Sequence, residues 1–152
     1  MTYEIIDATQ DDLDRIADLW VQLVASQREY GAHLLAEENR SSARDLLGQY
    51  IVSDDLLVAK EDDRIYGFVM VHTERGWFKQ DGIRGIIDNI FVIQEKRGKG
   101  IGTALIENAE LRLREADVDY ISIEAMADNT LARSIYENNG YDEHRIIYEK
   151  SI

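Results

Sequence analysis

The sequence predicts a single mixed α/β (α+β) domain over residues 1–152, with a central sheet of six to seven strands flanked by helices. Apolar runs typical of strands are interspersed with segments that have helical spacing. One of these strands leads directly through a glycine-rich loop into a helix. No proline, repeat or low-complexity tract marks a linker. A chain of this length buries about two thirds of its unfolded surface, which is enough for one core.

The first half of the chain predicts a strand, helical segments and a hairpin. The strand covers 3–7, and Thr9 with Asp12 forms a capping pair for a helix that runs to about Arg28, because apolar residues recur there at helical spacing. The other elements of this half are helical pieces at 33–39 and 42–51 and a hairpin at 56–74 that turns at 61–63.

The second half predicts strands and helices around the glycine loop. A nearly continuous apolar strand covers 86–93 and a helix follows at about 100–116. The remaining elements are a strand at 120–126, a short helix at 129–140 that Gly140 ends, and one or two strands at 141–150.

Composition limits the possible functions. The net charge of −13 argues against a general nucleic-acid binder, because phosphates would be repelled. The acidic surface has three readings: solubility, attraction of a cationic substrate, or adaptation to high salt. There are no cysteines and only three scattered histidines, so no disulfide and no metal site are expected. Without a membrane-spanning run or a signal peptide, the prediction is a soluble cytoplasmic protein.

The segment QEKRGKGIGT, residues 94–103, concentrates glycine and positive charge in this acidic chain. Its glycines are Gly98, Gly100 and Gly102, and its cations are Lys96, Arg97 and Lys99. A helix N-terminus presents free N–H groups and a positive dipole end, and glycines let a ligand approach the backbone. The loop therefore predicts a pyrophosphate site, and the alternative is a tight turn with solvated cations. Neither the P-loop nor the G-x-G-x-x-G dinucleotide pattern fits it.

These residues resemble the acetyl-coenzyme A segment of the GNAT superfamily of N-acetyltransferases. The pattern [RQ]-x-x-G-x-[GA] is matched by Arg97, Gly100 and Gly102, after a strand that carries Val92. Gln94 stands where the family often has proline, which implies a less rigid loop entrance.

A second signature of the same family, N-x-x-A-x-x-x-Y followed by G-[FY], lies further along. It is matched by Asn129, Ala132, Tyr136, Gly140 and Tyr141. Both signatures occur in the right order with a strand between them, and the resemblance covers about residues 65–150.

The resemblance implies a mostly antiparallel sheet and acetyl transfer from acetyl-coenzyme A to a primary amine of a small molecule or protein, in a ternary complex and without a metal. The acceptor could be cationic, and a homodimer stays open. The residues expected at the coenzyme are Ile90, Phe91, Val92, Arg97, Gly98, Lys99, Gly100, Ile101, Gly102, Thr103, Asn129, Arg133 and Tyr136.

The resemblance also implies catalytic roles. The backbone N–H of Val92 would stabilise the thioester oxygen, and Tyr136 would protonate the leaving thiolate. Tyr136 could instead be a packing residue, and Arg133 could be solvated.

Deprotonation of the amine needs a base, because an ammonium with a pKa of about 10.4 is mostly charged at neutral pH. Asp88 interrupts an apolar strand and, four residues before Val92, is expected to point to the same face. The alternatives are a carboxylate paired with Arg84 or a backbone amide, Glu124 as the base, or a water chain.

A cluster of acidic residues near the end of the first helix, Glu29, Glu37 and Glu38, could attract a cationic acceptor or form a solvated face. Two other functions stay open: a catalytically silent coenzyme A sensor or scaffold of the same fold, and a nucleotide-binding oxidoreductase, which the glycine spacing disfavours.

Overall fold

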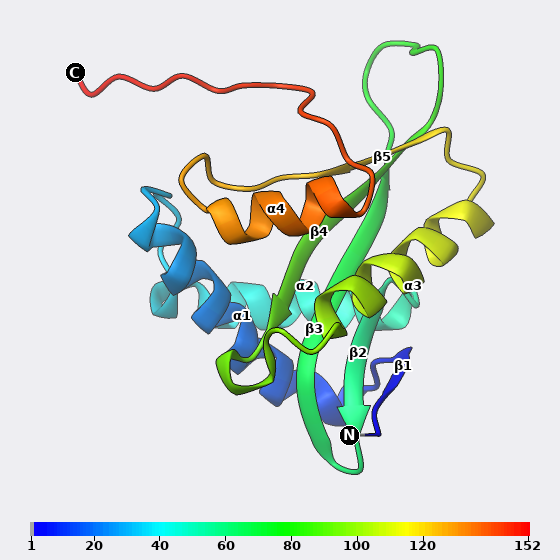
Figure 1. The fold of residues 1–152 in the computed structure, drawn as a ribbon. Coiled ribbons are helices and arrows are strands. Elements are labelled where there is room, and N and C mark those ends of the chain that lie inside the picture. Colours follow the sequence, from blue (N-terminus) through cyan, green and yellow to red (C-terminus); the bar gives the residue numbers. More distant parts are fainter. Residues whose placement is uncertain (1) are drawn as a thin grey trace.

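One five-stranded sheet forms the centre of the computed structural model, which describes residues 2–152 (Figure 1). The strands are β1 (Glu4–Asp7), β2 (Leu56–Glu61), β3 (Arg64–Glu74), β4 (Arg84–Val92) and β5 (Tyr120–Ile123), and they lie side by side in chain order. Three pairings are antiparallel and the β4–β5 pairing is parallel. The mixed α/β class and the mostly antiparallel sheet are confirmed.

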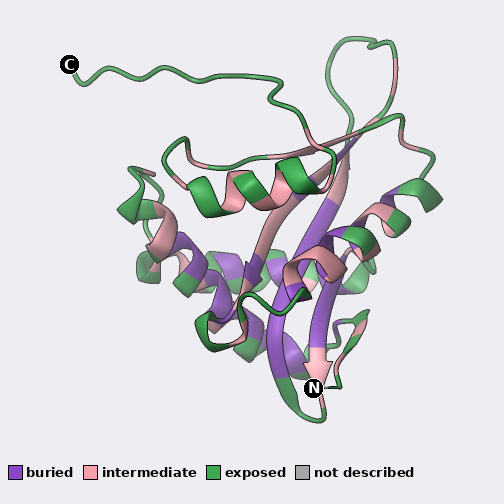
Figure 2. Ribbon diagram, in the orientation of Figure 1, coloured by how far each residue is buried: buried purple, intermediate pink, exposed green. Residues whose placement is uncertain are grey.

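The strand count of six to seven is wrong, because the segment 141–152 forms neither a strand nor a helix. Among residues 2–152 no strand follows β5. The segment is extended, exposed beyond Tyr141, and projects from the body of the domain (Figures 1 and 2). A strand needs a neighbour for its backbone groups, and this segment has none here.

Two layers of helices cover the sheet. The helices are α1 (Leu13–Glu29), α2 (Arg40–Val52), α3 (Ile101–Glu115) and α4 (Thr130–Asn138). In Figure 1, α3 and α4 lie in front of the strands and α1 and α2 lie behind them. Leu113 of α3 packs against Gly85 of β4, where a Cβ would stand only 2.9 Å from it. The Tyr141 hydroxyl, just past α4, donates to Glu110 of α3 at 2.7 Å.

The predicted start of the first helix is confirmed. The Thr9 backbone N–H donates to the Asp12 carboxylate at 2.9 Å, and Lys60 Nζ of β2 donates to the same carboxylate at 2.8 Å. Asp12 is only 5 % exposed. Burial raises the pKa of Asp12, but the hydrogen bonds from Lys60 and Thr9 outweigh burial. The pKa of this carboxyl therefore lies below its ordinary value.

Strand β4 carries one more residue than β3 in the middle of their pairing. Asn89 pairs with Met70 and Ile87 pairs with Val71, so Asp88 has no partner across the ladder. An extra residue of this kind is a β-bulge, which bends the strand and is frequent near active sites. The parallel pairing of β4 with β5 ends at Ile87 and Ile123, directly before this bulge.

Candidate active site

Beyond the bulge, one edge of β4 is left open. The N–H of Ile93 donates to Tyr66 of β3 at 2.8 Å. Because backbone groups of a strand point alternately to its two edges, the N–H groups of Val92 and Ile90 point away from β3. On that side β5 has already ended its pairing. Two backbone donors therefore face the gap between the parting strands.

The glycine loop adjoins this gap and leads into α3. Gly98 and Gly100 adopt φ angles of +76° and +84°, which residues with a side chain rarely adopt. A Cβ at either glycine would have no atom within 4 Å, and one at Gly102 would meet only Val92, at 4.0 Å. Packing therefore does not exclude side chains here, and the space over the loop is open to a ligand.

The cations of the loop differ in their surroundings. Lys96 lies over the Tyr66 ring, 4.5 Å from its centroid, and so points back to the sheet. Arg97 donates from Nε to the Val92 carbonyl at 2.9 Å, and its guanidinium lies 5.4 Å from the centre of the Phe91 ring. Arg97 and Lys99 are exposed. These two cations, rather than Lys96, have charge to offer to an anion above the loop.

Side chains of two predicted coenzyme contacts lie in the core. Phe91 is 7 % exposed and Ile101 is 1 % exposed, so any contact with a ligand there would run through their backbone. Ile90 and Thr103 are half-buried.

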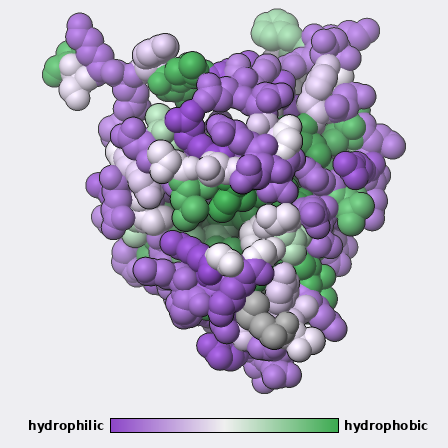
Figure 3. Space-filling model, in the orientation of Figure 1, coloured by the Kyte–Doolittle hydropathy of each residue, from purple (hydrophilic) through white to green (hydrophobic). Residues whose placement is uncertain are grey.

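Helix α4 brings three predicted residues to the α3 side of the sheet. Tyr136 is half-buried, and burial raises its pKa to about 12. The Asn129 side chain caps the helix by accepting the Ala132 N–H at 3.2 Å. Arg133 donates to the Ala127 carbonyl at 3.0 Å and forms an ion pair with Glu143. A hollow lined by hydrophobic residues lies between α4 and the glycine loop (Figure 3).

Asp88 belongs to a polar cluster on the opposite side of the sheet. His72 Nδ1 of β3 lies 2.6 Å from Asp88 Oδ2, and the Tyr50 hydroxyl of α2 donates to the same oxygen at 3.0 Å. Burial, followed by the negative charge of Asp88, raises the pKa of Tyr50. A carboxylate can only accept hydrogen bonds, so Nδ1 of His72 donates, and in the neutral imidazole Nε2 keeps the lone pair. His72 and Tyr50 were not predicted as site residues.

The expectation that Asp88 and Val92 point to the same face is wrong. Val92 faces α3, because its Cγ2 lies 4.0 Å from the place where a Cβ on Gly102 of α3 would stand. Asp88 instead contacts α2 and β3. The bulge inserts one residue and reverses the alternation of side chains beyond it. Pairing of Asp88 with Arg84 is also wrong, because Arg84 lies 3.6 Å from Glu74 and donates to Ser122.

The other acidic candidates lie at the surface. Glu124 is exposed and follows the last residue of β5. Glu37 accepts from Arg40 Nε at 2.9 Å, and Glu29 and Glu38 are exposed.

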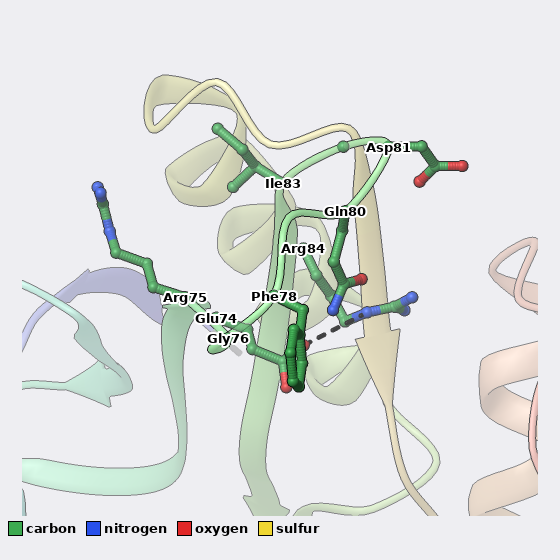
Figure 4. Close-up of a pocket in the computed structure, with 9 residues that line it drawn as sticks. Glu74, Arg75, Gly76, Phe78, Gln80, Asp81, Ile83 and Arg84 are labelled. Atoms are coloured by element: carbon green, nitrogen blue, oxygen red, sulfur yellow. Dashed lines mark ion pairs between the residues drawn. The ribbon is translucent and has the colours of Figure 1, made fainter.

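A separate pocket of about 310 Å³ lies under the loop between β3 and β4 (Figure 4). Phe78, Gln80 and the Glu74–Arg84 ion pair line it. It lies at the start of β4, the opposite end from the glycine loop, so it is distinct from the hollow beside α4.

Residues 2–152 hold neither a metal-binding cluster nor a helix that could span a membrane. No three His, Cys, Asp or Glu side chains in that range gather into a group that could hold a metal ion. None of the helices described there is both long and apolar enough to cross a bilayer.

Comparisons of the sequence and of the fold with known proteins both find acetyltransferases. The model of the acetyltransferase (GNAT) family matches residues 15–141. A protein of Methanocaldococcus jannaschii, named an uncharacterized N-acetyltransferase, is 33 % identical over 91 residues, which cover 59 % of this chain and 54 % of that relative. An N-acetyltransferase of Archaeoglobus fulgidus with a similar name is 32 % identical over 108 residues, 70 % of each chain. The match thus spans about half the length of the first relative.

A solved structure agrees in fold. The crystal structure of a predicted acetyltransferase from Clostridium acetobutylicum with acetyl-CoA superposes with a TM-score of 0.76, over 99 % of this chain and 96 % of that one. The two sequences are 15 % identical, so this likeness concerns the fold alone.

Proposed function

The chain belongs to the GNAT family of acetyltransferases, and from that premise we propose that it is an N-acetyltransferase that transfers the acetyl group of acetyl-coenzyme A directly to a primary amine bound at the same time. The observation that carries this proposal is the parting of β4 from β5 beside the glycine loop. It leaves backbone donors facing a gap beside an open glycine loop.

The loop fits the coenzyme's phosphates. Gly98 and Gly100 keep the backbone bare above the loop, and the first turn of α3 adds its unpaired N–H groups. Arg97 and Lys99 would add charge-assisted hydrogen bonds. Asn129 of α4 would contact the pantetheine arm, and Arg133 would exchange its ion pair with Glu143 for a coenzyme phosphate.

The thioester oxygen gains negative charge as the amine attacks. The N–H of Val92, or that of Ile90, is the donor we assign to this oxygen, because both point to the open edge of β4. A fixed donor of this kind typically changes the rate about 10²–10³-fold.

The leaving thiolate needs a proton. Tyr136 is the group we assign to it, since burial raises its pKa to about 12 and it stays protonated at neutral pH. Its ring is half-buried on α4, the helix that lies on the same side of the sheet as the glycine loop's helix α3.

The attacking amine must lose a proton. We assign its removal to His72 Nε2, with Asp88 as the residue that orients the imidazole. This changes the role of Asp88 from the base itself to the partner of the base. The acceptor would then approach from the α1–α2 side of the sheet, opposite to α4.

A thiol-release assay with a panel of amines tests the proposal. The panel covers polyamines, amino acids, aminoglycosides and peptide N-termini, and mass spectrometry identifies the acetylated product. The chain has no cysteine, so a thiol reagent reports only coenzyme A. Release that requires one class of amine, and that Tyr136→Phe greatly slows, is expected. Coenzyme A binding without acetylation of any amine would instead indicate a coenzyme sensor.

A further inference from the structure

The pocket under the β3–β4 loop opens on the same face of the sheet as His72. Across the ladder of these two strands Glu74 pairs with Arg84, and His72 pairs with Ile86. Alternate residues of a strand share a face, so the Glu74 and Arg84 side chains lie on the face that carries His72. Gly85, between Arg84 and Ile86, packs against α3 on the opposite face. The pocket therefore adjoins the candidate base on the α1–α2 side of the sheet.

The ion pair in this pocket is loose. Arg84 Nε lies 3.6 Å from the Glu74 carboxylate, which is too far for a hydrogen bond. Arg84 is fixed from another direction, because it donates to Ser122 and its guanidinium lies 5.4 Å from the centre of the Tyr120 ring. Within residues 2–152 the Glu74 carboxylate accepts no hydrogen bond. A guanidinium has five N–H donors, so both charges keep bonding capacity for a ligand.

A pair of opposite charges at this spacing is complementary to the zwitterionic end of an amino acid. The α-ammonium of such a ligand would donate to Glu74, and its α-carboxylate would accept from the fork of N–H groups on Arg84. The Arg84 side chain is only 22 % exposed, so water competes less for these bonds. A diamine would leave Arg84 without a partner, and a simple carboxylate would be repelled by Glu74.

Two uncharged side chains complete the pocket around the ion pair. Phe78 and Gln80 lie beside it, whereas Arg75 and Asp81 point away from it (Figure 4). Asp81 instead accepts a hydrogen bond from the Tyr120 hydroxyl. The charges that face a ligand here are therefore those of the ion pair itself.

The spacing from the pocket to His72 fits one amino acid side chain. Two residues of a strand span roughly 7 Å, which separates Glu74 from His72. In lysine the five bonds from Cα to the distal nitrogen span about 6 Å. An amino acid held at its α-groups in the pocket can thus bring a distal amine to His72 Nε2, while its α-amine stays with Glu74. A diamino acid also carries a net positive charge, which suits a chain of formal charge −13.

We propose that this pocket is the acceptor subsite and that the acceptor is a free diamino acid of the lysine or ornithine type, acetylated on its distal amine. This substrate class rests on the acetyl transfer proposed above. In that reaction the distal nitrogen forms a bond to the acetyl carbon as the carbon–sulfur bond breaks. Of the two protons that the ammonium loses, one ends on the coenzyme sulfur and one in solvent.

Steady-state kinetics of the wild-type chain with three amines of similar length test the proposal. Lysine is compared with cadaverine, which lacks the carboxylate, and with ε-aminocaproate, which lacks the α-ammonium. Each missing group should lower kcat/KM at least about ten-fold, because a hydrogen bond between charged groups is lost. Mass spectrometry should place the acetyl group on the distal nitrogen of lysine. Equal use of either analogue, or acetylation of the α-nitrogen, overturns the proposal.

Two variants assign the charged groups of the pocket. Arg84→Gln should slow lysine about ten-fold but should not slow cadaverine, which has no carboxylate to bind. Glu74→Gln should slow lysine by a similar factor but should not slow ε-aminocaproate. Lys79→Gln is the matched control, because Lys79 is an exposed cation of the same loop that does not line the pocket. Equal slowing of lysine and its analogue in either variant contradicts the assigned roles.

Calorimetry without an acetyl donor, with and without free coenzyme A, separates the pocket from the reaction. Lysine should bind to the wild type and to Lys79→Gln, and at least about ten-fold more weakly to Arg84→Gln and Glu74→Gln. If this pattern appears and no amine is acetylated, the pocket stands and the proposed acetyl transfer fails. If amines are acetylated but lysine does not bind, or binds independently of Arg84 and Glu74, the acetyl transfer stands and the pocket proposal is overturned.

Discussion

Helices α3 and α4 lie on the same face of the sheet, yet only α3 is embedded in the core. Five residues of α3 are buried, whereas no residue of α4 is (Figure 2). Leu105 of α3 is fully buried, but Ile135 and Tyr136 of α4 are only half-buried. The packing around α3 is therefore completed by other residues of the same chain. The α4 side is amphipathic but incompletely covered, as expected of a surface that receives a ligand or a partner.

The difference between α3 and α4 predicts that a substitution in α4 has the largest effect on catalysis. Tyr136→Phe keeps the ring and removes the proton, so single-turnover acetylation should fall about 10²–10⁴-fold. Thermal stability and calorimetric affinity for coenzyme A should stay close to those of the wild type. A folded variant that acetylates at the wild-type single-turnover rate would make Tyr136 a packing residue.

The largest effect on stability should come from α3. Leu105→Ala removes a fully buried side chain and should lower the free energy of unfolding by about 2–5 kcal/mol. Leu131→Ala on α4 is the matched control. Leu131 is 59 % exposed, so its change should stay within about 0.5 kcal/mol. Urea unfolding measures both, and equal losses would contradict the difference between the helices.

On the other face of the sheet, His72→Gln should lower kcat/KM roughly 10²-fold, because it removes the imidazole to which we assign removal of the amine's proton. Tyr50→Phe loses one hydrogen bond to the same carboxylate and serves as the control, with a much smaller effect expected. If His72→Gln keeps the wild-type rate and pH profile, proton removal belongs to Glu124 or to water.

The Asp12–Lys60 pair should make the free energy of unfolding depend on pH in the acidic range. The folded-state pKa of Asp12 is lowered, so its contribution is present at neutral pH and lost as the pH falls through that pKa. Asp12→Asn should therefore cost about 1–3 kcal/mol at neutral pH and progressively less below about pH 4. Asp11→Asn, at an exposed neighbour, should cost little. A penalty for Asp12→Asn that does not change with pH would contradict this assignment.

The smallest effect concerns the glycine loop. Arg97→Ala with Lys99→Ala should weaken coenzyme A binding about ten-fold, or roughly 1.4 kcal/mol, and reduce its salt dependence. Arg75→Ala with Lys79→Ala removes the same charge from the exposed β3–β4 loop and should leave affinity unchanged. Equal affinities in the two double variants would remove the phosphate-binding role of the loop.

Local patterns predicted most of the fold. The hairpin, the long strand, the glycine loop and its helix were each visible in a window of consecutive residues, and they hold in the structure. Whether residues 141–150 form a strand depends on distant parts of the chain and not on their own sequence alone. Their sequence favours a strand, but a strand forms only against a neighbour.

The motifs predict which residues belong to the candidate site, but they could not predict the register of β4. The single extra residue at Asp88 reverses the side-chain alternation, which no periodicity in IIDNIFVI reveals. His72 interrupts the end of an apolar strand and could have been noticed on that ground. Tyr50 could not, because its contact depends on how α2 docks on the sheet.

The bulge at Asp88 also has a kinetic consequence. It places Asp88 beside His72 on the α1–α2 side, while Val92, the glycine loop and α4 face the other side. Two substrates that enter from opposite faces need not block each other's path. We therefore expect binding in either order, with double-reciprocal plots that intersect rather than run parallel. Each product should likewise be able to leave while the other is still bound.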